Sequence, residues 1–298
     1  MADAAYAMLE DRGVLAVAGE DRHGFLQGLV SNDLTKATAD CALYAALLTA
    51  QGKYLHDFFI VTLGDTLYLD AEAARLEDLR RRLALYKLRS KVTLTIVSDR
   101  WRIAAGFGPG VAAALGLPET PGVARGFAAG IAYVDPRLAD LGLRFLLPRD
   151  GAAALEAAGL KPAEAAAYDR LRLALGVPDG SRDLEIEKAI LLEAGFDELN
   201  GIDWKKGCYM GQELTARTKY RALIKKRLLP VTVEGPLPAP GTPIRLGDAE
   251  VGEMRSGCEQ AALALLKLDA VAQAAATDQP LAAGAARLRP HKPDWARF

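Results

Sequence analysis

Residues 43–69 read LYAALLTAQGKYLHDFFIVTLGDTLYL, three apolar runs separated by short polar turns. The first two runs, 43–49 and 54–63, flank the turn Gln-Gly-Lys, and a Gly-Asp turn leads into the third run. Strands joined by turns this short pair in antiparallel fashion. The stretch therefore predicts an antiparallel sheet.

Helical and strand-like patterns surround this sheet on both sides. A strand is predicted at 14–17, followed by a short helix from Asp21 that carries Phe25 and Leu26 on one face. Downstream, leucines at 76, 79 and 83 recur at helical spacing, and 92–96 alternates as a half-buried strand. Helices on one face of an antiparallel sheet indicate an α+β fold related to the ferredoxin-like arrangement.

The same order of predicted elements recurs weakly further along the chain. Near residue 229 the pattern of the sequence changes. Between residues 101 and 158 we expect a second α+β module. From 229 onward, short strand-like runs alternate with Pro and Gly, which predicts a small β-barrel with no strong helix. The predicted domains are 1–228, made of two interleaved modules at about 1–98 and 99–228, and 229–298.

Composition excludes several classes of protein. The 298 residues carry 37 Lys plus Arg and 38 Asp plus Glu, so no global charge favours nucleic acid. The longest uncharged run, 103–118, is too short and too rich in Gly to span a bilayer, and the N-terminus MADAAYAMLEDRG lacks the basic start of a secretory signal. Three scattered cysteines and three scattered histidines argue against a disulfide scaffold and a metal site, and they predict a cytoplasmic location.

One basic segment stands out, residues 199–226, LNGIDWKKGCYMGQELTARTKYRALIKK. Within it, Gly207 and Gly211 bracket Cys208, and glycine permits positive φ and close backbone approach. A thiol beside Lys206 and free backbone amides is a candidate reactive cysteine, because cations favour the thiolate. The alternative interpretation is a tight turn in which a buried Cys208 acts as a small hydrophobe.

The octapeptide KGCYMGQE at 206–213 resembles the K-G-C-Y/F-x-G-Q-E signature of the YgfZ family. These proteins are folate-binding relatives of the glycine-cleavage T-protein and include mitochondrial iron–sulfur assembly factors. Further blocks agree: FLQGLVSND at 25–33, QGK at 51–53, and GVPDGSRD at 176–183 followed by Glu193, which is similar to the mitochondrial-type branch. The resemblance covers residues from about 10 to 290.

This resemblance implies both an architecture and a function. The fold would be T-protein-like, with two interlocked ferredoxin-like modules around a central folate-type groove and a C-terminal β-barrel. The function would be assembly or repair of [4Fe–4S] proteins with tetrahydrofolate as cofactor, rather than conventional enzyme catalysis. Implied partners are iron–sulfur scaffold or A-type carrier proteins and [4Fe–4S] client enzymes. A cluster would be held only transiently, together with such a partner.

The resemblance also assigns roles to residues of the signature. Cys208 would be the functional thiol, and Lys206 would keep its sulfur ionised. Gly207 and Gly211 would let a partner approach. The remaining residues that would shape the loop are Tyr209, Gln212 and Glu213.

The residues implied for folate depart from the family pattern at one position. The T-protein motif R-x-E-A-G supplies a carboxylate near the folate, and Ala174 stands where that glutamate would be. Asp70 is then the candidate acidic contact, although an alternative is that it caps a helix at 71–87. Further candidates for binding the folate or another anionic ligand are Trp204, Arg217 and Tyr220.

Two other functions stay open on the sequence. One is folate-dependent aminomethyl transfer in the manner of the T-protein, against which Ala174 counts. The other is a non-enzymatic module that binds RNA or an acidic protein through the basic stretch at 205–227. Because the chain is near neutral overall, nucleic acid is the less expected partner.

Overall fold

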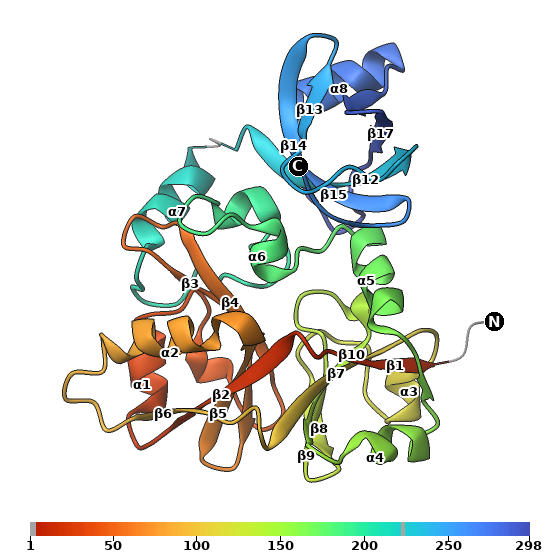
Figure 1. Ribbon diagram of the computed structural model, residues 1–298. Coiled ribbons are helices and arrows are strands. Elements are labelled where there is room, and N and C mark those ends of the chain that lie inside the picture. Colours follow the sequence, from red (N-terminus) through yellow and green to blue (C-terminus); the bar gives the residue numbers. More distant parts are fainter. Residues whose placement is uncertain (1–3, 222–223) are drawn as a thin grey trace. The chain divides into compact units, whose positions relative to one another are not determined.

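The computed structural model describes residues 4–221 and 224–298 (Figure 1). Two short segments lie outside the described residues. They are residues 1–3, at the start of the N-terminal segment MADAAYAMLEDRG, and Ala222 and Leu223 of the basic stretch. The chain forms two compact units. The first comprises residues 1–48, 55–168 and 199–210, and the second comprises 49–54, 169–198 and 211–298.

A five-stranded sheet forms half of the first unit, in the order β3-β4-β5-β2-β6. Its strands are β2 (Arg12–Ala18), β3 (Leu43–Leu48), β4 (Tyr54–Leu63), β5 (Thr66–Glu72) and β6 (Thr93–Ile96). Two helices, α1 (Arg22–Gln27) and α2 (Leu76–Ala84), and the 3₁₀ turns η1 (Leu34–Lys36) and η2 (Ala73–Arg75) connect them. Leucines of both helices pack with Leu15, Val17 and Leu69 in one apolar core, so α1 and α2 cover the same face.

The other half of the first unit is a six-stranded sheet, in the order β11-β1-β7-β10-β9-β8. Its strands are β1 (Ala5–Met8), β7 (Trp101–Phe107), β8 (Ala124–Phe127), β9 (Gly130–Val134), β10 (Leu143–Pro148) and β11 (Lys161–Pro162). The helices α3 (Val111–Ala114) and α4 (Ala152–Ala157) and the turn η3 (Ala139–Leu141) belong to this half. Because β1 pairs with β7 whereas β2 pairs with β5, the chain enters through one sheet and continues into the other, and the predicted interlocking of two α+β modules is confirmed.

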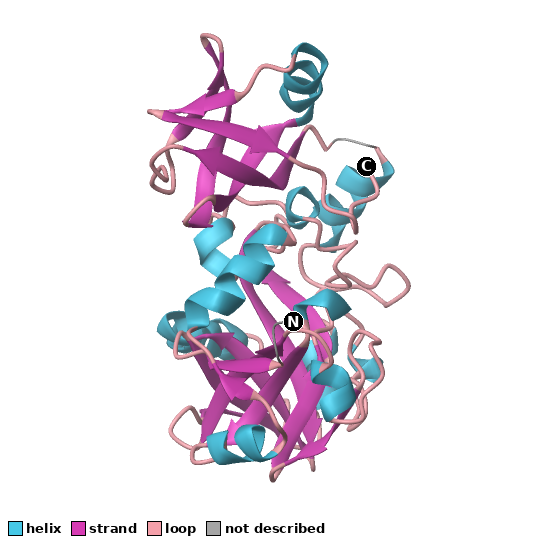
Figure 2. Ribbon diagram, turned by 90° about the vertical axis from the view of Figure 1, so that its right-hand side faces the viewer, coloured by secondary structure: helices cyan, strands magenta, loops and turns pink. Residues whose placement is uncertain are grey.

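The second unit contains a closed six-stranded barrel, in the order β12-β15-β14-β13-β16-β17. Its strands are β12 (Lys226–Glu234), β13 (Pro243–Leu246), β14 (Ala249–Cys258), β15 (Ala261–Lys267), β16 (Leu281–Ala283) and β17 (Ala286–Pro290). The expectation that this region has no strong helix is wrong, because α8 (Leu268–Thr277) follows β15 and packs Ala270 and Ala274 into the barrel core. Figure 2 shows α8 as the cyan helix beside the magenta barrel strands.

Helical segments that precede the barrel in the chain complete the second unit. They are the C-terminal half of α5 (Ala165–Ala174), α6 (Gly180–Asp183), η4 (Leu191–Ala194) and α7 (Gln212–Tyr220). Asp183 fixes them to the barrel: its carboxylate accepts hydrogen bonds from Arg172 Nη1 at 2.9 Å and from the backbone N of Ser256 at 3.0 Å. The GVPDGSRD block thus ends at a buried aspartate whose hydrogen bonds link α6 to β14.

Among the described residues, none of the helices is long and apolar enough to cross a membrane.

Candidate functional site

Cys208 is an exposed free thiol in the first unit, on a short stretch between two buried residues, Lys206 and Tyr209. Lys206 is 7 % exposed and Tyr209 is 6 % exposed, whereas Gly207 and Cys208 are both exposed. Both sides of the loop are therefore fixed, and its apex faces solvent. The alternative interpretation of a buried structural cysteine is wrong.

Lys206 anchors this loop to the segment that follows α1. Its ammonium Nζ donates to the carbonyl oxygens of Gln27 at 2.8 Å, Val30 at 2.5 Å and Asn32 at 2.8 Å. It also lies 5.1 Å from the centre of the Tyr209 ring. Burial lowers the pKa of Lys206 to about 8. Because an ammonium has three N–H donors and all three are used by carbonyls, Lys206 anchors the loop, and its expected effect on the sulfur stays a prediction.

A second anchor, Asp203, was not expected from the sequence. Its Oδ1 accepts from the backbone N of Lys205 at 2.7 Å and of Lys206 at 3.1 Å, and its Oδ2 accepts from Lys36 Nζ at 2.5 Å. An aspartate that accepts from the amides two and three residues later is a turn signal that the sequence does carry, as D-W-K-K. The turn leading to Cys208 is thus held by an aspartate inside the same segment.

The FLQGLVSND block at 25–33 supplies most of the remaining contacts to this segment. The backbone N of Met210 donates to the Gly28 carbonyl at 3.1 Å, and Ser31 Oγ donates to the Gly201 carbonyl at 2.6 Å. Asn32 Nδ2 donates to the Asn200 carbonyl at 2.7 Å. The two motifs quoted from distant parts of the sequence therefore form one structural feature, which we call the thiol loop and its cradle: residues 200–210 and 27–32.

The two glycines of the signature differ. Gly211 has φ +81° and begins α7 in the second unit, where a Cβ on Gly52 would lie 2.7 Å from its carbonyl oxygen. The close approach explains the glycine of the QGK turn, and the positive φ explains the glycine at 211. Gly207 has no positive φ, and a Cβ there would have no heavy atom within 4 Å. A special backbone conformation at Gly207 is therefore not observed, and its small size leaves space beside Cys208.

The end of the signature and the residues after it form α7 in the second unit. Glu213 is exposed and pairs with Arg217 one turn later at 2.5 Å, so it does not orient the loop as expected. Tyr220 is 75 % exposed near the helix end. Gln212 is the first residue of α7.

Asp70 is neither a helix cap nor an available acidic contact. It lies within β5, is 3 % exposed, and accepts from Arg12 Nε at 2.7 Å and from Arg144 Nη2 at 2.5 Å. Arg144 in turn stacks 3.9 Å from the centre of the Phe59 ring. Burial alone would raise the pKa of Asp70, but the two guanidinium groups lower it below its usual value. The two sheets of the first unit thus meet through a buried ionic cluster.

The residues present do not fit the folate contact expected of Asp70. Both of its carboxylate oxygens already accept from arginine, and Ala174 is exposed at the end of α5 with no polar side-chain atom. Trp204 is half-buried in the thiol loop of the first unit, whereas Arg217 and Tyr220 belong to the second. Tetrahydrofolate binding stays a prediction, and no step of the function proposed below passes through it. In the described part of the chain no group of three or more His, Cys, Asp or Glu could hold a metal ion.

The fold of the chain is shared with a solved structure. The chain is similar to the glycine cleavage system aminomethyltransferase T from Bartonella henselae with a TM-score of 0.77 and 16% sequence identity, over 99% of this chain and 87% of that one. The predicted T-protein-like fold with a C-terminal barrel is confirmed. At this identity the likeness shows the fold alone.

The sequence of the chain matches a domain family and several relatives. Residues 225–298 match the family described as CAF17, C-terminal beta-barrel domain. The chain is 35% identical to the human "Iron-sulfur cluster assembly factor IBA57, mitochondrial" over 87% of this chain and 76% of that protein. It is 30% identical to the homologue from Pyricularia oryzae over 94% of this chain and 76% of that one.

These relatives also correct one expectation. The cytoplasmic location inferred from the cysteines and the N-terminus is overturned, because the human, mouse and fungal relatives are named as mitochondrial proteins. The family resemblance read from KGCYMGQE is confirmed. With identities of 30% and 35% to these relatives over most of its length, this chain belongs to the family of IBA57 iron–sulfur cluster assembly factors.

Proposed function

We propose that this chain supports the maturation of [4Fe–4S] proteins and that Cys208 is the thiol through which it handles iron. The observation that carries the proposal is the exposed sulfur at the apex of a loop whose two sides are buried and hydrogen-bonded. A rigid, accessible thiol is suited to a transient ligand, because the conformational cost of positioning it is met during folding rather than during binding.

The chemistry needs a second protein. Cys208 would lose its proton on binding iron and would then be one thiolate ligand. Iron–sulfur clusters are normally held by four ligands, so the remaining ones would come from a scaffold or A-type carrier that presents the cluster. The cluster is the cargo of this step, and the exposed Gly207 leaves space for the partner's backbone beside the sulfur.

The test compares Cys208→Ser with Cys258→Ser, a half-buried cysteine of the barrel that serves as the matched control. Each variant is mixed with a cluster-loaded A-type carrier, and complex formation is followed by the visible absorption and circular dichroism of the cluster. In cells, the activity of a [4Fe–4S] enzyme is compared with that of a [2Fe–2S] enzyme. We expect Cys208→Ser alone to lose the mixed complex and the [4Fe–4S] activity. Full activity of Cys208→Ser would refute the role of the thiol.

Tetrahydrofolate is retained as the proposed cofactor on the family resemblance alone. Equilibrium dialysis with tetrahydrofolate measures it directly, and Arg217→Gln tests the contact expected of α7. Binding unaffected by Arg217→Gln would remove that residue from the site. The outcome is independent of the Cys208 test.

Neither alternative function is favoured by a specific contact. Aminomethyl transfer would need an acidic folate contact, and Asp70 is engaged by two arginines. In the basic stretch, Arg217 pairs with Glu213, and Lys219 lies 3.5 Å from Asp197, so part of its charge is compensated. Retention of RNA by the full chain at low salt would revive the second alternative.

A further inference from the structure

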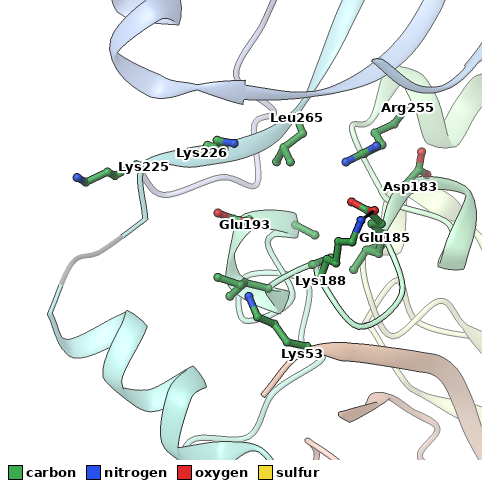
Figure 3. Close-up of a pocket in the computed structure, with 13 residues that line it drawn as sticks. Lys53, Asp183, Glu185, Lys188, Glu193, Lys225, Lys226, Arg255 and Leu265 are labelled. Atoms are coloured by element: carbon green, nitrogen blue, oxygen red, sulfur yellow. Dashed lines mark hydrogen bonds and ion pairs between the residues drawn. The ribbon is translucent and has the colours of Figure 1, made fainter. Parts of the chain in front are cut away.

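A cavity of about 420 Å³ lies within the second unit (Figure 3). Its wall combines the QGK turn before β4, the segment from α6 to η4, and the barrel strands β12, β14 and β15. Its volume falls in the range of pockets that hold small organic ligands. None of the contacts described above for the thiol loop involves its lining residues.

Half of the charged groups in the wall are neutralised by partners. Asp183 is bound by Arg172 at 2.9 Å, and Lys188 pairs with Glu185. Arg255 pairs with Glu253 on the same strand. These pairs build the wall and leave little net charge for a ligand.

Four charged groups remain: Lys53, Lys225, Lys226 and Glu193. Within residues 4–221 and 224–298, the side chains of Lys53, Lys226 and Glu193 have no ion pair and no side-chain hydrogen bond. In Figure 3, Lys53 rises from the QGK turn and Lys226 extends from the barrel side, with Glu193 on η4 between them. Two unpaired cations from separate elements thus face one half-buried acid.

The charges of both lysines act on Glu193, which lines the same cavity. Burial raises the pKa of Glu193 above its usual value, and the charges of Lys226 and Lys53 oppose that rise. Two lysine charges face one carboxylate, so this carboxylate alone does not compensate both of them. A ligand that brings further negative charge would complete the neutralisation.

The cavity also has an apolar part, formed by Leu184, Ile190 and Leu265. A purely inorganic anion would leave this surface in contact with water. A molecule with a short carbon skeleton would bury it, and apolar burial adds to affinity at about 25 cal/mol per Å².

We propose that this cavity binds a small organic dianion, with its negative groups on Lys53 and Lys226 and its carbon skeleton against Leu184, Ile190 and Leu265. Dicarboxylates and organic phosphates share this chemistry. The proposal concerns a site separate from Cys208 and holds whether or not the thiol handles iron.

Lys225 provides a matched control inside the same wall. It carries the same charge as Lys226 and is its neighbour in sequence, but its ammonium points away from Glu193 in Figure 3. A general basic surface would respond equally to loss of either lysine. A built site would respond only to loss of Lys53 or Lys226.

The experiment titrates the full chain by calorimetry with glutarate and with glycerol 3-phosphate, using butyrate and the neutral glutaramide as controls. We expect one of the two dianions to bind with a dissociation constant below about 1 mM, and both controls to bind at least about tenfold more weakly. The dianion that binds identifies the source as a carboxylate or a phosphate. Lys53→Gln and Lys226→Gln should each weaken binding about tenfold, and Lys225→Gln less than about twofold.

A fourth variant tests the geometry by a gain. Glu193→Gln removes the competing negative charge between the two lysines and should tighten dianion binding about threefold. All four substitutions are of half-buried or exposed side chains, and unchanged melting temperatures verify that each variant folds. The proposal is overturned if neither dianion binds at about 10 mM, or if the three lysine variants weaken binding equally.

Discussion

The ammonium of Lys206 lies 2.5 Å from the carbonyl oxygen of Val30, although the two residues are 176 positions apart in the chain. This contact, with those to Gln27 and Asn32, ties the thiol loop to its cradle. The cysteine of the signature is therefore positioned by the N-terminal block, and the lysine beside it has a structural role.

Removing the Lys206 ammonium should destabilise the first unit. Lys206→Met leaves three carbonyl groups without their donor, and a buried unpaired polar group costs about 1–3 kcal/mol. We expect the free energy of unfolding to fall by about 2–4 kcal/mol in urea titrations. Lys205→Met, at an exposed neighbouring position, should change it by less than about 0.5 kcal/mol. Equal losses in the two variants would contradict the anchoring role.

Asp70 should be more costly to alter than any surface acid of the first unit. Asp70→Asn leaves the buried guanidinium groups of Arg12 and Arg144 without their counter-charge, and breaking a buried pair in this way costs about 3–5 kcal/mol. Glu77→Gln breaks the exposed pair with Arg80 and should cost less than about 1 kcal/mol. Denaturant midpoints measure both. An Asp70→Asn midpoint as close to wild type as that of Glu77→Gln would show that the cluster adds nothing.

His56 should contribute to acid sensitivity. Burial, with help from Arg75, lowers its pKa from 6.5 to about 4, against the opposing effect of the hydrogen bond that His56 Nε2 donates to Asp78. Between these values the unfolded chain binds a proton that the folded chain does not, so stability falls as the pH drops from 6.5 to 4, by about 3 kcal/mol.

The measurement is the pH dependence of the unfolding free energy, compared with His56→Gln. The variant should lose about 3 kcal/mol less than wild type across that window. Parallel curves for the two proteins would place the acid sensitivity elsewhere.

Cys208 should react first among the three cysteines. It is exposed, whereas Cys41 and Cys258 are half-buried and burial raises the pKa of Cys41. Iodoacetamide labelling followed by mass spectrometry should modify Cys208 about tenfold faster than either of the others. Labelling of Cys258 at the rate of Cys208 would contradict the exposure described for the loop.

Much of the fold follows from local patterns in the sequence. The alternation at 92–96 and the leucines at 76, 79 and 83 predicted β6 and α2 because each pattern reflects one buried face. The helix α8 was not predicted, although AVAQAAAT is rich in alanine, the strongest helix former. Short strand-like runs on both sides of it favoured an all-β prediction for the whole region.

The site was harder to predict for a different reason. The motif identified Cys208, but the partners of Lys206 and Asp70 lie far away in sequence, on other strands and loops. Lys206 was expected to act on the nearby sulfur, and Asp70 was expected to contact the folate or, as the alternative, to cap the next helix, because their true partners are not their neighbours in sequence. Charged residues whose partners are distant are the ones whose roles a single sequence leaves open.

The dependence of the thiol loop on residues 27–32 has a consequence for synthesis. A ribosome must translate past position 210 before the loop can meet its cradle, which was synthesised long before it. Products that stop before residue 210 therefore lack the geometry that displays the sulfur. The metal chemistry proposed for this cysteine is thereby limited to chains in which residues 200–210 have been made and have closed on residues 27–32.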